Sequence, residues 1–126
     1  MNSLKRILLV EDDPDIREMI IGFLSSAEFE ITSAADLGTA ISALSNGNAF
    51  DLAILDFWLG TDHAVSLMDS VHSKAHNLPI IIISGGNGHM DLEKTEAISN
   101  ASGAVKFLQK PFRKADLMEA VTSIIG

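Results

Sequence analysis

Acidic side chains directly follow two strongly apolar runs of the sequence. Glu11 and Asp12 come after the run 7–10, and Asp56 comes after the run 52–55. Carboxylates that are crowded together repel one another and lose hydration beside an apolar core, so a cluster of them calls for a cation. Oxygen ligands of this kind suit a hard divalent ion, above all Mg²⁺, with Mn²⁺ as the other candidate.

Two further side chains with useful chemistry follow later apolar runs. Ser84 comes after the run 80–83, and Lys110 stands before Pro111 after the last such run. A hydroxyl and an ammonium beside a cation suit an anionic oxygen group such as a phosphoryl. Three acids, one hydroxyl and one lysine are together the components of a phosphoryl-transfer site.

The segments around these residues alternate between short apolar strands and amphipathic helices. The predicted strands are 6–10, 29–34, 52–55, 80–83 and 104–108, and the predicted helices are 14–24, 36–46, a segment around 65–71, 90–100 and 114–125. Alternation of this kind implies parallel strands with right-handed crossovers, and continuously apolar strands imply helices on both faces. The predicted fold is α/β, a five-stranded doubly wound parallel sheet with flavodoxin-like (βα)5 topology and strand order 2-1-3-4-5.

This topology decides where the reactive side chains should meet. Open parallel sheets bind ligands at the carboxyl ends of their strands. We therefore expect Glu11, Asp12, Asp56, Ser84 and Lys110 to lie along one rim of the sheet.

Length and composition limit the function further. The chain has 126 residues, and we predict one domain over 1–126 with no output domain. Its net charge of −8 argues against direct nucleic-acid binding, because phosphate contacts need clustered Lys and Arg. Cysteine is absent, which excludes disulfide and thiol chemistry. The sequence shows no signal peptide and no apolar stretch long enough for a bilayer, so we expect a cytoplasmic protein without membrane association.

Taken in order, the acidic pair, Asp56, Ser84 and the run Lys110-Pro111-Phe112 make this sequence resemble the receiver domain of bacterial two-component response regulators. The resemblance covers about Lys5 to about Ile125. It implies that Asp56 accepts a phosphoryl group from a sensor histidine kinase or a phosphotransfer protein. It further implies that Lys110 pairs with the phosphoryl oxygens and that Ser84 bonds to the group and moves on activation.

The resemblance also assigns metal ligands and a switch. Asp12 would ligate the metal beside Asp56, Glu11 would reach it through water, and the backbone carbonyl of Trp58 would be another ligand. Lys110-Pro111 would be a cis peptide, and Phe107 would be the aromatic switch residue. The face formed by the last two helices and the fifth strand would then change for a downstream protein or a fused output domain. Some relatives form a homodimer on phosphorylation, and the sequence leaves this open.

Several residues are better explained by structure than by chemistry. Asp13 is predicted to cap a helix that begins at Pro14, and Asp15 suits the same helix end. His72 and His76 could share one helix face, but no third metal ligand is evident, so a solvated face is preferred.

Departures from the family pattern leave alternatives open. Gly60, His63 and Ala64 stand where the family usually has proline and an acid–glycine pair, so we predict a mobile loop after Asp56. The glycine-rich run 85–88 predicts a second labile segment. The alternative function is a receiver-like protein-binding module that is not phosphorylated. An enzyme acting on other substrates is disfavoured, because no second acid follows Asp56 closely, and catalysis would be limited to its own phosphoryl transfer and autodephosphorylation.

Overall fold

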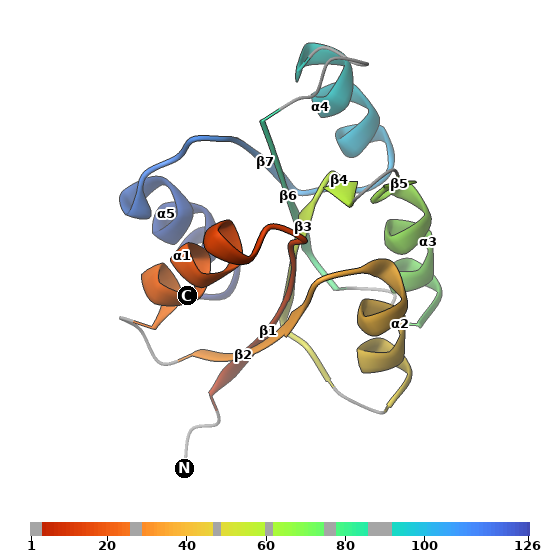
Figure 1. Ribbon diagram of the computed structural model, residues 1–126, viewed down its shortest axis with the longest axis horizontal. Coiled ribbons are helices and arrows are strands. Elements are labelled where there is room, and N and C mark those ends of the chain that lie inside the picture. Colours follow the sequence, from red (N-terminus) through yellow and green to blue (C-terminus); the bar gives the residue numbers. More distant parts are fainter. Residues whose placement is uncertain (1–3, 26–28, 47–48, 60–61, 75–77, 86–91) are drawn as a thin grey trace.

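The computed structural model describes residues 4–25, 29–46, 49–59, 62–74, 78–85 and 92–126. A five-stranded parallel sheet forms its centre, with the strands in the order β2-β1-β3-β6-β7 (Figure 1). These strands are β1 (Lys5–Val10), β2 (Phe29–Ala34), β3 (Leu52–Asp56), β6 (Ile80–Ser84) and β7 (Lys106–Gln109). The predicted order 2-1-3-4-5 is confirmed, since β6 and β7 are the fourth and fifth strands of this sheet.

Helices cover both faces of the sheet (Figure 1). The helices are α1 (Pro14–Leu24), α2 (Leu37–Ser45), α3 (Val65–Lys74), α4 (Leu92–Ala101) and α5 (Lys114–Ile125). α1 and α5 pack against one face, whereas α2, α3 and the half-buried side of α4 pack against the other. None of the helices described is long and apolar enough to cross a membrane.

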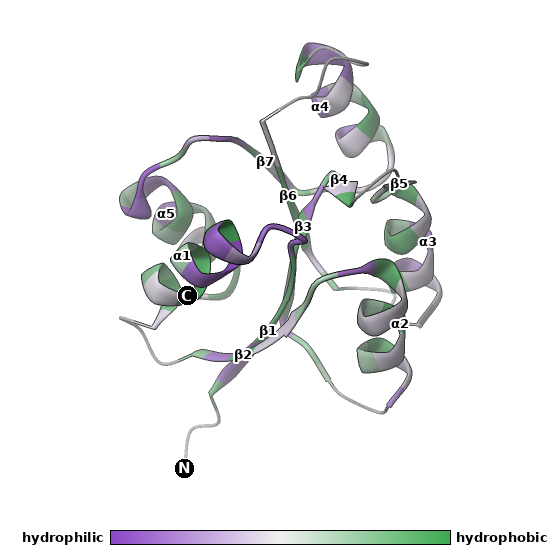
Figure 2. Ribbon diagram, in the orientation of Figure 1, coloured by the Kyte–Doolittle hydropathy of each residue, from purple (hydrophilic) through white to green (hydrophobic). Residues whose placement is uncertain are grey.

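The strands alternate their side chains between these two layers. Leu8 and Val10 of β1 pack toward α2 and α3, while Ile7 and Leu9 pack toward α1 and α5. All five residues of β3 and of β6 are buried, as expected for central strands covered on both faces. Figure 2 shows this burial as hydrophobic strands inside the molecule, with a hydrophilic segment where α1 begins.

The segment after Asp56 differs from the sequence prediction. Trp58–Leu59 forms β4, Asp62–His63 forms β5, and the two pair antiparallel as a small hairpin. The prediction of an irregular loop was therefore wrong for these four residues. The hairpin is anchored because Leu59 and Ala64 are buried in the core on the α2–α3 side and because the Ala64 amide donates to the Phe57 carbonyl at 2.8 Å.

Other boundaries shift by one or two residues. β7 begins at Lys106 rather than at residue 104, and α4, described from Leu92, ends at Ala101 rather than at residue 100. The predicted labile segment falls largely on residues 86–91, which lie outside the described residues, as do His76 and His89. His72, expected on a solvated face, is half-buried.

Two glycines differ in what surrounds them. Gly103, between α4 and β7, has a φ of 105°, and a Cβ placed on it would lie 2.4 Å from Cε1 of His72. Gly22 lies within α1, and a Cβ placed on it would meet nothing within 4 Å. Gly103 is therefore required by backbone conformation and by the ring packed over it, whereas Gly22 is not required by packing.

We predict opposite effects for alanine at these two positions. Gly103→Ala should lower the free energy of unfolding by about 1–3 kcal/mol, because it strains the backbone and collides with His72. Gly22→Ala should raise it by about 0.5–1 kcal/mol through helix propensity. Urea denaturation followed by circular dichroism measures both, and a stable Gly103→Ala variant would contradict the packing described.

Candidate functional site

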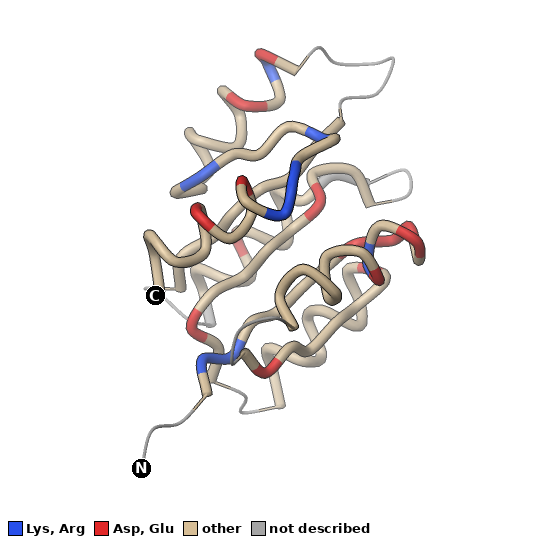
Figure 3. The backbone as a smooth tube through the Cα atoms, turned by 90° about the vertical axis from the view of Figure 1, so that its left-hand side faces the viewer, with Lys and Arg blue, Asp and Glu red and all other residues tan. Residues whose placement is uncertain are grey.

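Three carboxylates meet where β1 and β3 end. Glu11 and Asp12 follow β1, Asp56 ends β3, and one ligand oxygen from each lies within 4.8 Å of the others. The two strands are hydrogen-bonded neighbours, with Val10 opposite Leu55, which brings the acids to one rim. Figure 3 shows acidic residues gathered at the end of the sheet away from the N-terminus. The predicted convergence of Glu11, Asp12 and Asp56 is therefore present in the structure.

Lys110 reaches the same cluster from the far end of the chain. Its Nζ lies 2.7 Å from Oε1 of Glu11 and 3.4 Å from Oδ2 of Asp56. The Lys110 amide donates to the Ser84 carbonyl at 2.8 Å, and the peptide to Pro111 is cis, as the resemblance implied. A Cβ on Gly85 would lie 3.5 Å from Cβ of Lys110, an ordinary contact distance, so the lysine stem passes directly beside the residue that follows β6.

Glu11 is held more firmly than its neighbours. Its side chain is fully buried, and Oε2 accepts from the Asp13 amide at 3.2 Å while Oε1 binds Lys110. Its amide donates to the Ala34 carbonyl at 3.0 Å, and its carbonyl accepts from Nη1 of Arg17 at 2.8 Å. The sequence analysis did not identify Arg17. The available signal was an arginine one turn into a helix that begins beside an acidic cluster.

Asp13 has the structural role predicted for it. Its Oδ1 accepts from the amides of Asp15 at 2.9 Å and Ile16 at 3.3 Å, and Pro14 is the first residue of α1. The carboxylate of Asp13 thus caps the helix. Asp12, one residue earlier, is exposed and belongs to the acidic cluster.

The β4–β5 hairpin sets the direction of the Trp58 backbone. The Phe57 carbonyl bonds to the Ala64 amide, and bonded and unbonded pairs alternate along an antiparallel ladder. The next pair, Trp58 with His63, is therefore an unbonded pair, and both backbone groups of Trp58 face away from His63. The Trp58 amide donates to Oδ1 of Asp56 at 3.4 Å, which brings the Trp58 backbone beside the acidic cluster.

Ser84 and Phe107 lie on the strands next to Asp56. Asp56 pairs with Ile83, and the following residue, Ser84, is fully buried at the end of β6. Phe107 pairs with Ile82, is half-buried and packs against the core on the α2–α3 side. Both residues are thus close in the sheet to the end that carries the cluster.

Burial and neighbouring charge change the acidity of this site. Burial raises the pKa of Asp56 to about 8, the adjacent Glu11 carboxyl raises it as well, and Lys110 opposes both effects. Burial alone would lower the pKa of Lys110, but its hydrogen bond to Glu11 and the charges of Asp56 and Glu11 raise it. The structure thus opposes the ionised form of Asp56 and favours the charged form of Lys110.

The donor set fits a hard divalent cation. The three clustered carboxylates all offer oxygen ligands, which Mg²⁺ and Mn²⁺ prefer. When all three acids are ionised, Lys110 neutralises one charge and leaves a double negative charge for the ion. Asp12 is the exposed member of the cluster and therefore the side from which an ion can enter.

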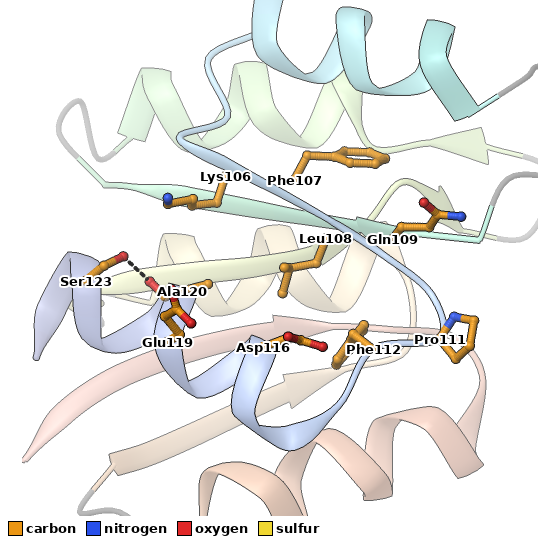
Figure 4. Close-up of a pocket in the computed structure, with 10 residues that line it drawn as sticks. All are labelled: Lys106, Phe107, Leu108, Gln109, Pro111, Phe112, Asp116, Glu119, Ala120 and Ser123. Carbon is orange, nitrogen blue, oxygen red and sulfur yellow. Dashed lines mark hydrogen bonds between the residues drawn. The ribbon is translucent and has the colours of Figure 1, made fainter.

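A cavity of about 420 Å³ lies elsewhere, between β7 and α5 (Figure 4). It is lined by Lys106, Phe107, Leu108, Gln109, Pro111, Phe112, Asp116, Glu119, Ala120 and Ser123. The acidic cluster is not part of this lining. The two features are nevertheless connected, because Lys110 stands in the chain between the β7 side of the cavity and Pro111.

Comparison with known proteins identifies relatives for this fold and site. The curated relatives include the "Regulatory protein VirG" of Agrobacterium tumefaciens (strain 15955), 34% identical over 110 residues, which cover 86% of this chain and 39% of that protein. They also include the "Transcription factor prr1" of Schizosaccharomyces pombe, 34% identical over 117 residues, which cover 90% of this chain and 20% of that protein. The chain thus spans well under half the length of these relatives.

Solved structures share the same arrangement of strands and helices. A CheY-like response regulator receiver domain protein from Methanospirillum hungatei JF-1 has a TM-score of 0.85 and 29% identity, covering 96% of this chain and 93% of that one. The chemotaxis protein CheY4 of Vibrio cholerae has a TM-score of 0.84 and 25% identity, covering 97% of this chain and 99% of that one. The family described as the response regulator receiver domain matches residues 7–122. This match over most of the chain shows that the protein belongs to the response regulator receiver domain family.

Proposed function

We propose that this receiver domain signals by accepting a phosphoryl group on Asp56. The observation that carries the proposal is the surroundings of that carboxylate. It lies at the rim of the sheet within 4.8 Å of the Glu11 and Asp12 oxygens, with Lys110 Nζ at 3.4 Å. A carboxylate that is surrounded by other carboxylates can accept an anionic phosphoryl group only when a positive charge beside it offsets the repulsion.

The transfer itself needs a donor with a good leaving group. An oxygen of Asp56 attacks the phosphorus of a phosphohistidine on a sensor histidine kinase or phosphotransfer protein. A P–O bond forms, the P–N bond breaks, and the imidazole nitrogen keeps the electron pair and takes up a proton. Lys110 stabilises the charge on the phosphoryl oxygens. Asp12, Asp56 and Glu11 would hold a Mg²⁺ ion, which would supply further positive charge for the phosphoryl oxygens.

The raised pKa of Asp56 keeps the acceptor carboxyl unreactive when no cation is bound. With a pKa of about 8, this carboxyl is largely protonated near neutral pH when no cation is bound, and a protonated carboxyl is a poor nucleophile. Positive charge at the cluster favours loss of that proton. Acceptor reactivity and cation binding are therefore linked through one proton on Asp56.

The output of the proposed switch lies on the α4–β7–α5 face. Ser84 is buried at the end of β6 and would bond to the phosphoryl group, while Phe107 on β7 is half-buried and would change its packing in response. Their movement would shift the population between two arrangements of α4 and α5. A downstream protein, a fused output domain or a second phosphorylated copy of the chain would read this face. Residues 1–126 would act as one domain, and no direct contact with nucleic acid is proposed.

Phosphorylation provides the direct test of this function. Wild-type protein incubated with Mg²⁺ and acetyl phosphate should gain one phosphoryl group by intact-mass measurement, and Asp56→Ala should gain none. Asp69→Ala removes an exposed carboxylate on α3 and is the matched control, expected to react like wild type. An unmodified wild type would favour the non-phosphorylated binding module, and modification of Asp56→Ala would place the acceptor elsewhere.

Trp58 reports on the cation, because it is the only tryptophan in the chain. Its fluorescence should change on adding Mg²⁺ and change again with beryllofluoride, a mimic of the phosphoryl group. Asp12→Asn should weaken the Mg²⁺ response strongly, since it removes a ligand charge. Asp13→Asn should leave it intact, because asparagine caps helices as well as aspartate does. Equal responses of the two variants would contradict the division between ligand and cap.

The buried Asp56 carboxyl should also lower the free energy of unfolding as the pH rises. The pKa of Asp56 is about 8 in the folded chain against an ordinary value of 3.8, so between these values the folded state binds more protons and stability falls with rising pH. Asp56→Asn removes this loss. In metal-free urea denaturation its gain in unfolding free energy should be about 3–4 kcal/mol larger near pH 8 than near pH 5. A gain in unfolding free energy that does not depend on pH would contradict a buried, protonated Asp56. The control is Asp69→Asn, which removes an exposed carboxylate in the same way.

A further inference from the structure

Arg17 lies close to several acidic residues, but its side chain bonds to a backbone carbonyl. It lies in the first turn of α1, two residues after a run of acids that consists of Glu11, Asp12, Asp13 and Asp15. Its Nη1 nevertheless donates to a backbone carbonyl, that of Glu11, at 2.8 Å. Within the described part of the chain it forms no ion pair with any of these acids.

The bond fixes the peptide that leads into the acidic cluster. The Glu11 amide is held by the Ala34 carbonyl at 3.0 Å and the Glu11 carbonyl by Arg17, so both backbone groups of this residue are bonded. The carbonyl belongs to the Glu11–Asp12 peptide. Holding it therefore sets the direction in which the chain enters Asp12, whose exposed carboxylate has no burial to position it.

Arg17, the donor of this bond, is held in place by the hydrogen bonds and the packing of α1. The Arg17 amide donates to the Asp13 carbonyl at 2.9 Å in the first turn of α1, which Asp13 also caps with its side chain. Ile20 and Leu24 of the same helix are fully buried against the α1–α5 side of the sheet. Arg17 thus ties the β1–α1 connection to a packed helix.

We propose that Arg17 is a positioning residue for the acidic cluster, holding the Glu11–Asp12 peptide so that the Asp12 carboxylate stays beside those of Glu11 and Asp56. This inference rests on the proposed function, because it assumes that the cluster binds a divalent cation. Groups that orient metal ligands without touching the metal affect affinity strongly. Arg17 accordingly sets how tightly the cluster binds the cation, and it leaves the chemistry of Asp56 itself unchanged.

The experiment compares Mg²⁺ binding by wild type, Arg17→Met, Arg17→Lys and Lys5→Met, followed by Trp58 fluorescence. Arg17→Met should weaken Mg²⁺ binding about tenfold. Lys5→Met removes the same charge from the opposite end of β1 and should bind like wild type. Arg17→Lys keeps the charge without the planar fork and should recover only part of the affinity.

Two further readouts separate positioning from a general structural effect. In metal-free protein, amide exchange at Asp12 and Asp13 should be faster in Arg17→Met, while exchange in the β3 and β6 amides and the thermal unfolding temperature stay close to wild type. With acetyl phosphate, Arg17→Met should need more Mg²⁺ for half-maximal phosphorylation but reach a similar rate at saturation.

The outcomes distinguish this proposal from the function on which it rests. A wild type that does not bind Mg²⁺ would refute both. A wild type that binds, with an Arg17→Met variant that binds equally well, would refute only the role of Arg17. Full recovery of Mg²⁺ affinity in Arg17→Lys would show that the positive charge alone matters. An equal loss of affinity in Lys5→Met would show the same, and either result would overturn the positioning role of Arg17.

Discussion

Repulsion among three carboxylates at the end of two neighbouring strands is the constraint on which the rest of the site depends. Parallel pairing of β1 and β3 brings Glu11 and Asp56 to one rim, where one is fully buried and the other nearly so. Such charges are stable only with compensation. The structure supplies this compensation through Lys110, whose ammonium lies 2.7 Å from Glu11 and 3.4 Å from Asp56, and Arg17 holds the backbone carbonyl of Glu11 beside them.

Much of this arrangement could be predicted from the sequence because it follows from regular patterns. Continuous apolar runs specify buried parallel strands, and the residue that ends each run must then lie at the carboxyl rim. This reasoning places Glu11, Asp12 and Asp56 together, and the Asp13-Pro14 pair marks where α1 begins. The strand order follows from the same alternation of strands and helices.

Other features carry no periodic signal, and the sequence analysis missed them. Strands of two residues, as in the β4–β5 hairpin, are too short to show alternation, and their stability comes from burial of Leu59 and Ala64 in a core contributed by distant segments. Arg17 looks like any polar residue of an amphipathic helix until its contact with a carbonyl is known. The stronger attachment of Lys110 to Glu11 than to Asp56 likewise depends on distances of 2.7 and 3.4 Å that no spacing encodes.

The ion pair between Lys110 and Glu11 also has a consequence for the order of events during folding. The two residues are 99 positions apart in the chain, so the pair cannot form until the last strand has joined the sheet. During synthesis, a ribosome-bound fragment that ends before β7 carries all three acids and lacks their ammonium partner. Electrostatic balance at the rim is therefore reached late, and it coincides with completion of the sheet.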